Sequence, residues 1–140
     1  MRVDFDDLEI RLDQSYWYKG DPFEGVAFYR GDDGTIESEV AFVDGVQWGA
    51  FTDFHPDGTP SCHGNIKHCV YHGEFTYFDQ SGKLSKKETY EYGILLSSKD
   101  FDASGNVVAE YSLPPDHPNT GLLAIYRDMK MAVPTPRNKT

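Results

Sequence analysis

The chain has 140 residues, a formal net charge of −10 and an aromatic share of 14%, a size that suits one domain with a modest core. No apolar run approaches the roughly 18 residues that a membrane span requires, and the first residues lack the basic and apolar regions of a signal peptide. We therefore expect a cytoplasmic protein, and the two cysteines imply no disulfide in that compartment.

The predicted elements begin with a lead-in strand over residues 1–13, in which Leu8, Ile10 and Leu12 alternate with polar or charged residues. Beyond it, turn residues recur in two interleaved sets, each with intervals of 23 to 25 residues. The first set is Gly34, Gly58, Gly82 and Gly105, and the second is Gly20, Gly45, Cys69 and Gly93. One repeat with two tight turns per period therefore organises residues 16–113, and each unit is a hairpin that must stack on the next.

The turns and the segments between them favour strands. Asp33-Gly34, Asp44-Gly45 and Asp57-Gly58 are hairpin dipeptides, because glycine accepts a positive φ and aspartate hydrogen-bonds the neighbouring backbone. The phrase Gly-x-Phe-x-x-Phe-x-x-x-Gly occurs in full at residues 49–58 and 73–82. Its aromatics are three apart, so we expect a bulge or bend that puts both on one face. A helix has the same spacing, but short segments closed by glycine at both ends favour strands.

The order of the turns predicts a mainly β fold, an antiparallel meander of eight or nine strands built from stacked hairpins of about 24 residues. After the meander, Pro118 opens a segment in which Leu122, Ile125 and Tyr126 follow helical spacing. We expect a C-terminal helix over residues 118–131 that caps an end or a face of the sheet. Residues 1–131 then form a single domain, and residues 132–140 a flexible tail.

The excess of negative over positive charge is confined to the first half of the chain. Residues 1–60 hold 14 acidic and 4 basic side chains, whereas residues 61–140 hold 9 of each. Such a charge disfavours nucleic acids and anionic membranes as ligands, because their phosphate groups are repelled. It favours a partner with a basic surface, since clustered charge accelerates encounter, while solubility is the competing explanation.

A second concentration of reactive side chains comprises Cys62, His63, His68, Cys69 and His72. These residues could supply a zinc tetrahedron, but the spacing of the two cysteines matches none of the usual paired-ligand patterns. The repeat explains part of the cluster, because Cys69 stands where other units have a turn glycine. We expect a variant hairpin without a metal or cofactor, and metal analysis of the purified protein would decide this.

Patterns typical of a catalytic site are absent from the sequence. There is no phosphate loop, dinucleotide fingerprint or nucleophile elbow. Cys62 and His63 are adjacent on a predicted strand and point to opposite faces, so they do not form a nucleophile with its base. Carboxylate pairs such as Glu37 and Glu39 would require a cleft that shifts their pKa values. We therefore expect a protein that is not an enzyme.

The repeat phrase, followed by an apolar residue two positions after the turn glycine, resembles the MORN-variant repeat of bacterial antitoxin and immunity proteins. The likeness covers residues 16–113 and is plainest at residues 45–58 and 72–84. It implies a MORN-like repeat domain that acts as an immunity protein (antitoxin) in the bacterial cytoplasm, binding and blocking one polymorphic or contact-dependent toxin. The resemblance supplies structural residues and no catalytic ones. A MORN-like scaffold or membrane-surface interaction module is the alternative.

Occlusion of a basic active site or groove by an acidic face is the mechanism that we expect. The candidate toxin contacts are Asp32, Asp33, Glu37, Glu39, Asp53, Asp57, Tyr29 and Trp48, with the two aromatics as anchors. Packing within the sheet is the competing explanation for both aromatics. The structural turn residues are Gly20, Gly34, Gly45, Gly58, Gly82, Gly93 and Gly105. The expected partner is a toxin domain with a basic surface, not nucleic acid or a membrane, and the free protein is expected to be a monomer or weak dimer.

Overall fold

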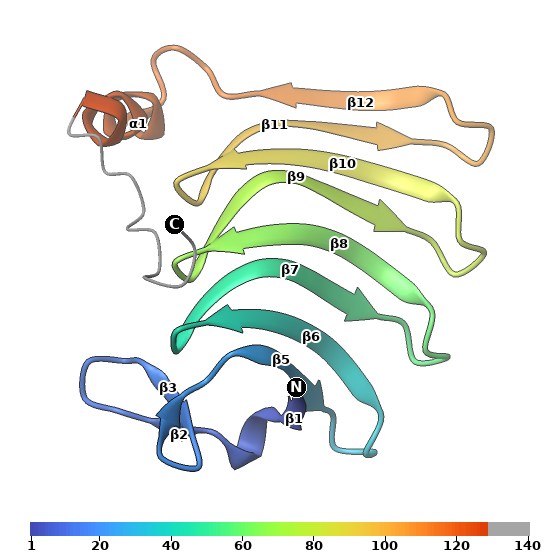
Figure 1. Cartoon of the computed structure of the whole chain (residues 1–140). Helices are drawn as coiled ribbons and strands as arrows, with labels where there is room; N and C mark the ends of the chain where they lie inside the picture. The colour runs from blue at the N-terminus through green and yellow to red at the C-terminus, as the bar shows by residue number, and fades with distance from the viewer. Residues whose placement is uncertain (129–140) are drawn as a thin grey trace.

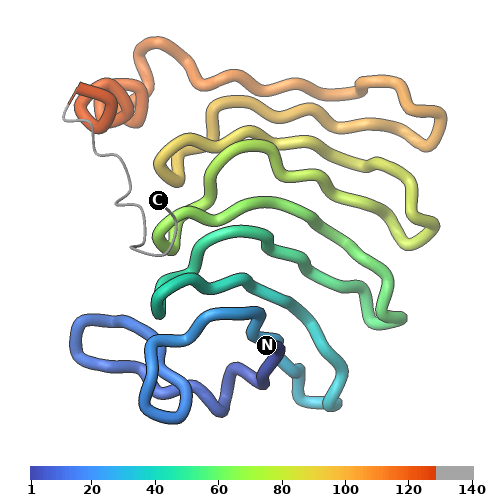
Figure 2. Tube along the Cα trace, viewed as in Figure 1, coloured from blue at the N-terminus to red at the C-terminus, as the bar shows by residue number. Residues whose placement is uncertain are grey.

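A computed structural model describes residues 1–128, in which hairpins stack into one curved sheet (Figure 1). The strands of this sheet are β1 (Arg2–Asp4), β5 (Gly25–Arg30), β6 (Ile36–Val43), β7 (Val46–Phe54), β8 (Pro60–Lys67), β9 (Val70–Phe78), β10 (Leu84–Glu91), β11 (Ile94–Phe101) and β12 (Val107–Ser112). Within the described residues, these nine strands follow the order β1-β5-β6-β7-β8-β9-β10-β11-β12. From β5 onward each strand pairs antiparallel with the next, and the chain winds back and forth (Figure 2). The predicted mainly β meander is confirmed.

The two sets of turn residues lie at opposite ends of the strands. The turns at Gly34, Gly58, Gly82 and Gly105 join strand pairs at the right of Figure 1, and those at Gly45, Cys69 and Gly93 join pairs at the left. Gly20 is the exception, since it forms a turn in a separate small sheet between β3 (Tyr16–Tyr18) and β4 (Asp21–Pro22). The period of the sequence therefore corresponds to one complete hairpin of the main sheet.

The two ends of the sheet use different turns. Asp44 and Gly45 have φ values of 50° and 78°, and His68 and Cys69 have values of 50° and 69°. Positive φ at both central residues is the type I′ pattern. At the opposite end only the glycine has a positive φ, such as 83° at Gly34, and a register shift adjoins each loop. That combination is the longer hairpin loop closed by a glycine bulge.

The single strand predicted over residues 1–13 is wrong, because this segment holds two short strands that belong to different sheets. β1 pairs in parallel with β5, and the chain then makes a 3-10 turn, η1 (Phe5–Asp7), before β2 (Glu9–Ile10) joins β3 and β4 in a three-stranded sheet. Phe5 and Leu8 both pack against the core, as residues three apart do across a 3-10 turn. Ile10 and Leu12 are 59% and 106% exposed, so the alternation does not mark a buried face.

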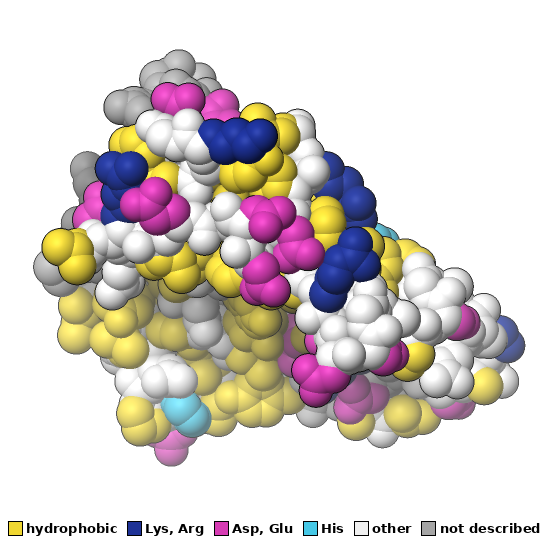
Figure 3. All heavy atoms as spheres, turned by 90° about the horizontal axis from the view of Figure 1, so that it is seen from below, with side chains coloured by type: hydrophobic (Ala, Val, Ile, Leu, Met, Phe, Trp, Pro, Cys, Tyr) yellow, Lys and Arg dark blue, Asp and Glu magenta, His cyan; other side chains and the backbone are white. Residues whose placement is uncertain are grey.

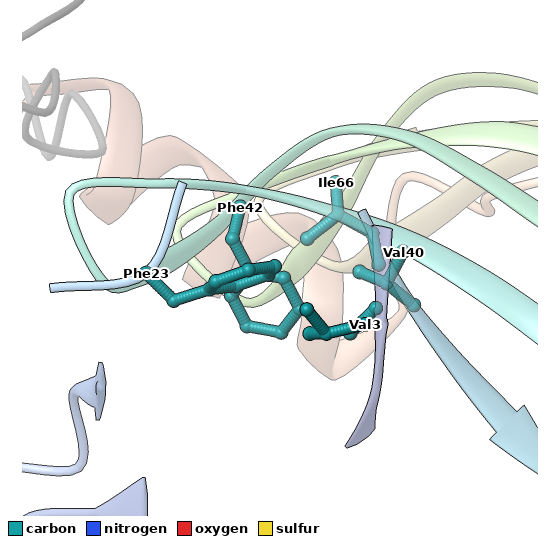
Figure 4. Packing of buried hydrophobic residues seen from close by; sticks show 6 residues of the cluster. Val3, Phe23, Val40, Phe42 and Ile66 are labelled. Atoms are coloured by element: carbon teal, nitrogen blue, oxygen red, sulfur yellow. The ribbon is translucent and has the colours of Figure 1, made fainter. Parts of the chain in front are cut away.

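The N-terminal segment covers the first strands of the meander and forms the core there. The buried cluster comprises Val3, Phe23, Ala27, Val40, Phe42 and Ile66 (Figure 4). The Phe42 ring lies 5.1 Å from that of Tyr16 and 5.4 Å from that of Phe23, in edge-to-face contacts. Residues outside the meander therefore bury the apolar face of its first units.

Farther along the sheet, aromatic side chains pack across the strands. Phe75 is fully buried, and its ring centroid lies 6.1 Å from Phe51, 4.5 Å from Tyr71 and 5.3 Å from Tyr90. The ring also lies over Gly64, where a Cβ atom would be 2.4 Å from its carbons. This aromatic row, Phe51, Tyr71, Phe75 and Tyr90, joins β7, β9 and β10 across the glycine of β8.

Aromatics three apart do not share a face, contrary to the expectation from the sequence. Phe75 belongs to the aromatic row, whereas the Phe78 ring contacts His63 at 5.6 Å. His63 itself is hydrogen-bonded to Thr52 at 3.1 Å. In the pairing with β10 the irregularity of register falls on β10, between Leu84 and Lys86, and the irregularity in the pairing with β8 lies before Thr76. From Phe75 to Phe78, β9 therefore keeps its alternation.

A C-terminal helix, α1 (Pro118–Asp128), packs beside the β10–β11 turn (Figure 1). Arg127 donates two hydrogen bonds to the Glu91 carboxylate at 2.5 and 2.7 Å, and the Tyr126 ring lies 5.6 Å from that of Tyr92. The predicted helix residues 129–131 and the predicted tail 132–140 lie outside the described residues. Through residue 128, no helix combines the length and apolar character needed to cross a membrane.

Cys69 holds a backbone conformation that glycine adopts without strain, because its φ is 69°. Cys69→Gly is expected to raise the free energy of unfolding by about 1 kcal/mol, the steric cost of an L-residue in this region. Urea unfolding measures the change. Cys69→Ser keeps the Cβ atom and serves as the control, with no gain expected. An equal gain for both variants would contradict the backbone explanation.

Candidate binding surface

Side chains of two successive hairpins enclose a hollow of about 360 Å³ at the end of the sheet that carries the glycine-bulge loops. Its lining consists of Asp33, Thr35, Ile36, Glu37, Ser38, Asp53, Phe54, His55, Pro56 and Ser61. We call it the acidic hollow, because three of the predicted contact carboxylates, Asp33, Glu37 and Asp53, line it together. The repeat brings these three groups together from the β5–β6 loop, β6 and β7.

The carboxylates of the hollow differ in how they are held. Asp53 accepts a hydrogen bond from the Ser38 hydroxyl across the β6–β7 pair. The carboxylates of Glu37 and of Asp32, an exposed residue of the β5–β6 loop, make no hydrogen bond or ion pair with any other described residue. A cationic partner could therefore bind Asp32 and Glu37 without first breaking an internal bond.

Two predicted contacts have a structural role as well. Asp33 accepts hydrogen bonds from the backbone N–H of Thr35 at 3.0 Å and from its hydroxyl at 2.6 Å. Asp57 makes the same bonds to Thr59, at 3.0 and 2.6 Å, one hairpin later. Both aspartates are exposed and brace their loops, so their presence is explained in part without any partner.

The remaining predicted contacts lie outside the hollow. Glu39 is paired with Arg2, at 2.6 Å. The Tyr29 ring stacks on Phe5 at 4.2 Å, and burial raises the pKa of Tyr29 to about 12. Trp48 lines a separate hollow of about 250 Å³ that includes Lys67 and His72. The structure therefore does not bring the two aromatics to the carboxylates, and Tyr29 is a packing residue.

His55 and Phe54 line the acidic hollow and were missed by sequence reasoning. The Nε2 atom of His55 lies 3.0 Å from the carbonyl oxygen of Phe78, on the next hairpin. The backbone N–H of His55 donates a hydrogen bond to the carbonyl oxygen of Thr59. One period earlier, the backbone N–H of Gly31 donates the equivalent bond to the carbonyl oxygen of Thr35. The repeat did not identify His55 as a lining residue, because Gly31, at the same place one period earlier, does not line the hollow.

Acidic side chains are scattered over the end of the molecule at which the repeat begins, with basic and apolar side chains between them, and apolar side chains also lie in a recess beside them (Figure 3). This view agrees with the sequence, in which 14 of the 23 acidic residues precede residue 61. The carboxylates of the acidic hollow thus belong to the half of the sequence that holds the excess negative charge. Clustered carboxylates of this kind attract a basic partner and repel phosphate.

The Cys/His cluster is divided between two faces and a turn. Cys62 is buried, and desolvation, with a smaller contribution from Asp53, raises the pKa of its thiol to about 11. His68 and Cys69 form the β8–β9 turn and line a third hollow, of about 560 Å³, with Asp13 and Tyr16. In the described part of the chain, no group of three or more His, Cys, Asp and Glu side chains is placed to hold a metal ion.

An aspartate braces each of the glycine-bulge loops of the described chain. Hydrogen bonds hold the pKa of these carboxyl groups below its usual value. The leading donors are the Thr35 hydroxyl for Asp33, the Thr59 hydroxyl for Asp57, the Ser81 hydroxyl for Asp79 and the Asn106 backbone N–H for Asp102. The folded state therefore binds fewer protons at these groups than the unfolded chain does in acid.

This difference makes stability depend on pH in a definite direction. A carboxyl group whose pKa is lowered by folding stabilises the protein above its unfolded pKa, of about 4, and loses that contribution as pH falls through the folded value. The thermal midpoint is therefore expected to fall between about pH 5 and pH 2. The double variant Asp33→Asn/Asp57→Asn keeps an acceptor without titrating and should lose less. Equal losses would show that other groups govern acid unfolding.

Comparison with known proteins leaves the family open. No protein-family model matches the chain, and no curated protein matches it. Among solved structures, the chain is similar to a crystal structure of an S. aureus TarM mutant in complex with fondaparinux, α-GlcNAc-glycerol and UDP. The TM-score is 0.43 and the sequence identity 16%, over 71% of this chain and 17% of that chain. The chain spans only about one sixth of that protein, and we base no functional conclusion on this likeness.

Proposed function

We propose that this protein is an immunity protein that binds a bacterial toxin domain in the cytoplasm and blocks a basic active site or groove. The observation that carries the proposal is the acidic hollow, where Asp33, Glu37 and Asp53 from two hairpins line one concave surface. Asp32 and Asp57 lie exposed on the loops beside it. Carboxylates arranged in this way suit guanidinium and ammonium groups, which often bind phosphate in nucleotide-directed enzymes.

Neutralisation of this kind requires no catalytic residue. The acidic surface would occupy the basic groove in place of phosphate groups, and its long-range attraction would speed association. Asp32 and Glu37 have no internal partner among the described residues, so they are the side chains most available to arginine or lysine. Arginine is favoured, because its planar fork can bind a carboxylate through two hydrogen bonds.

Co-expression with the product of the neighbouring gene tests the proposal. The C-terminal domain of that product, induced alone in a bacterial host, is expected to arrest growth. Co-expression of the wild-type protein is expected to restore growth, and the two proteins should elute together in gel filtration. A co-expressed, unrelated acidic protein of similar size controls for net charge. Unchanged toxicity in the presence of abundant soluble wild-type protein would contradict the proposal.

A further inference from the structure

The last strand, β12, is an open edge of the nine-stranded sheet. All six of its residues are exposed, including Val108 at 63% and Tyr111 at 38%. Figure 1 shows no element of the described chain beyond β12, and α1 lies past the end of the strands rather than along this edge. An uncovered edge presents backbone donors and acceptors that can pair with another strand.

The hydrogen bonds of β12 identify which of its backbone groups point outward. The N–H of Leu113 donates to the carbonyl oxygen of Leu96 at 2.8 Å. Because inward and outward residues alternate in an antiparallel pair, Tyr111 and Ala109 also face β11, and the N–H and C=O groups of Glu110 and Ser112 point away from the sheet.

The open ladder is short and sharply bounded. On one side, the register shifts between Asp100 and Phe101, which places a bulge in β12 just before Ala109. On the other side, Pro114 and Pro115 follow Leu113 and offer no N–H donor. Only residues 109–113 can therefore add regular pairing to another strand.

We propose that two copies of this chain pair through β12, antiparallel, about a two-fold axis at Tyr111. In this register Glu110 of each copy lies opposite Ser112 of the other. The pair exchanges both of its backbone hydrogen bonds, so each outward N–H and C=O group at these positions finds a partner. Tyr111 then faces Tyr111 of the second copy, and Ala109 faces Leu113.

Charge favours this register and this occupant. Moving the axis to Glu110 would place the two Glu110 carboxylates directly opposite each other, a destabilising arrangement. In the Tyr111 register Glu110 faces a serine, and Lys99 lies 4.0 Å from its carboxylate within the same copy. Residues 61–140 carry equal numbers of acidic and basic side chains. A second copy can therefore approach this edge while the acidic first halves of both copies remain at the far ends of the joined sheet. The proposed dimer does not depend on the proposed toxin binding.

Sedimentation equilibrium of the free protein tests the proposal, with loading concentrations up to about 1 mM to detect a weak interface. The wild type is expected to shift from monomer to dimer as concentration rises. Ser112→Pro removes an outward N–H on an edge strand, where proline is tolerated. This substitution should raise the dissociation constant of the dimer at least tenfold. Ser112→Ala keeps that N–H and is the control, with wild-type behaviour expected.

The results that would overturn the proposal are specific. A wild type that stays monomeric up to about 1 mM would exclude the dimer. Dimerisation retained by a folded Ser112→Pro variant, checked by circular dichroism and its thermal midpoint, would assign the interface to another surface. If Ser112→Pro does not fold, cross-linking through introduced cysteines provides a test that leaves the backbone donors in place.

Cross-linking also tests the register. In a Cys69→Ser background, Tyr111→Cys places two thiols across a non-hydrogen-bonded pair with Cα atoms about 4.5 Å apart, within the disulfide range of about 4.4–6.8 Å. Mild oxidation is expected to yield a covalent dimer of this variant. Glu110→Cys should remain monomeric under the same conditions. Cross-linking of Glu110→Cys but not Tyr111→Cys would overturn the proposed axis.

Discussion

Phe75→Ala is expected to lower the free energy of unfolding by about 3–5 kcal/mol. The Phe75 ring is 0% exposed, contacts three other aromatic rings and lies over Gly64. Its removal leaves a cavity between hairpins, because Gly64 has no side chain that could fill the space. Because each hairpin is stabilised mainly by its neighbours, the loss should destabilise the whole array.

Phe78→Ala is the matched control for this prediction. It is the same substitution on the same strand, three residues away, at the other aromatic position of the repeat phrase. Phe78 is only partly buried and its ring contacts His63 alone among the aromatic and imidazole rings of the described residues. Urea unfolding should show a clearly smaller loss, of about 1–2 kcal/mol. Equal losses would contradict the aromatic row as the main packing unit of the central hairpins.

Reversing charge at the acidic hollow is expected to slow association with the toxin about tenfold to a hundredfold at low salt. Asp32→Lys/Glu37→Lys is the informative variant, because neither carboxylate makes a hydrogen bond or ion pair in the described chain. The deficit should shrink as salt rises, since exposed charges are screened beyond about 10 Å at 0.1 M. Stopped-flow measurement of the association rate constant at several salt concentrations gives the comparison.

Asp116→Lys/Asp128→Lys controls for net charge in this experiment. It makes the same change in charge at two exposed residues of the C-terminal region. If binding depends on the position of the carboxylates, this variant should associate at close to the wild-type rate. Equal slowing by both double variants would indicate that only total charge matters. No slowing by either would contradict the acidic hollow as the binding surface.

The period of the turn residues predicted the meander, but not the type of each turn. Asp33-Gly34 and Asp44-Gly45 are the same dipeptide, yet only at the second does the aspartate also have a positive φ, of 50°. An Asp-Gly pair suits both a type I′ turn and a bulged loop. Strand register decides between them, and the register depends on contacts between hairpins that no local pattern contains.

The site was predicted in part for a similar reason. Acidic residues in the first half and a constant period were enough to expect carboxylates at neighbouring loops, and Asp33, Glu37 and Asp53 do share one hollow. Tyr29 and Trp48 were grouped with them because aromatics often anchor interfaces. Whether a strand aromatic faces the core depends on packing with distant segments, such as Phe5 against Tyr29.

Amide hydrogen exchange of the protein, free and in complex with the toxin domain, is the most direct test of where binding occurs. Slower exchange on binding is expected in residues 31–38 and 53–61, the two segments that contain the lining of the acidic hollow, and little change in β10 and β11. Because exchange is read along the backbone of the unmodified protein, no substitution complicates the result. Protection confined to residues after 61, with none at the hollow, would contradict the proposed binding surface.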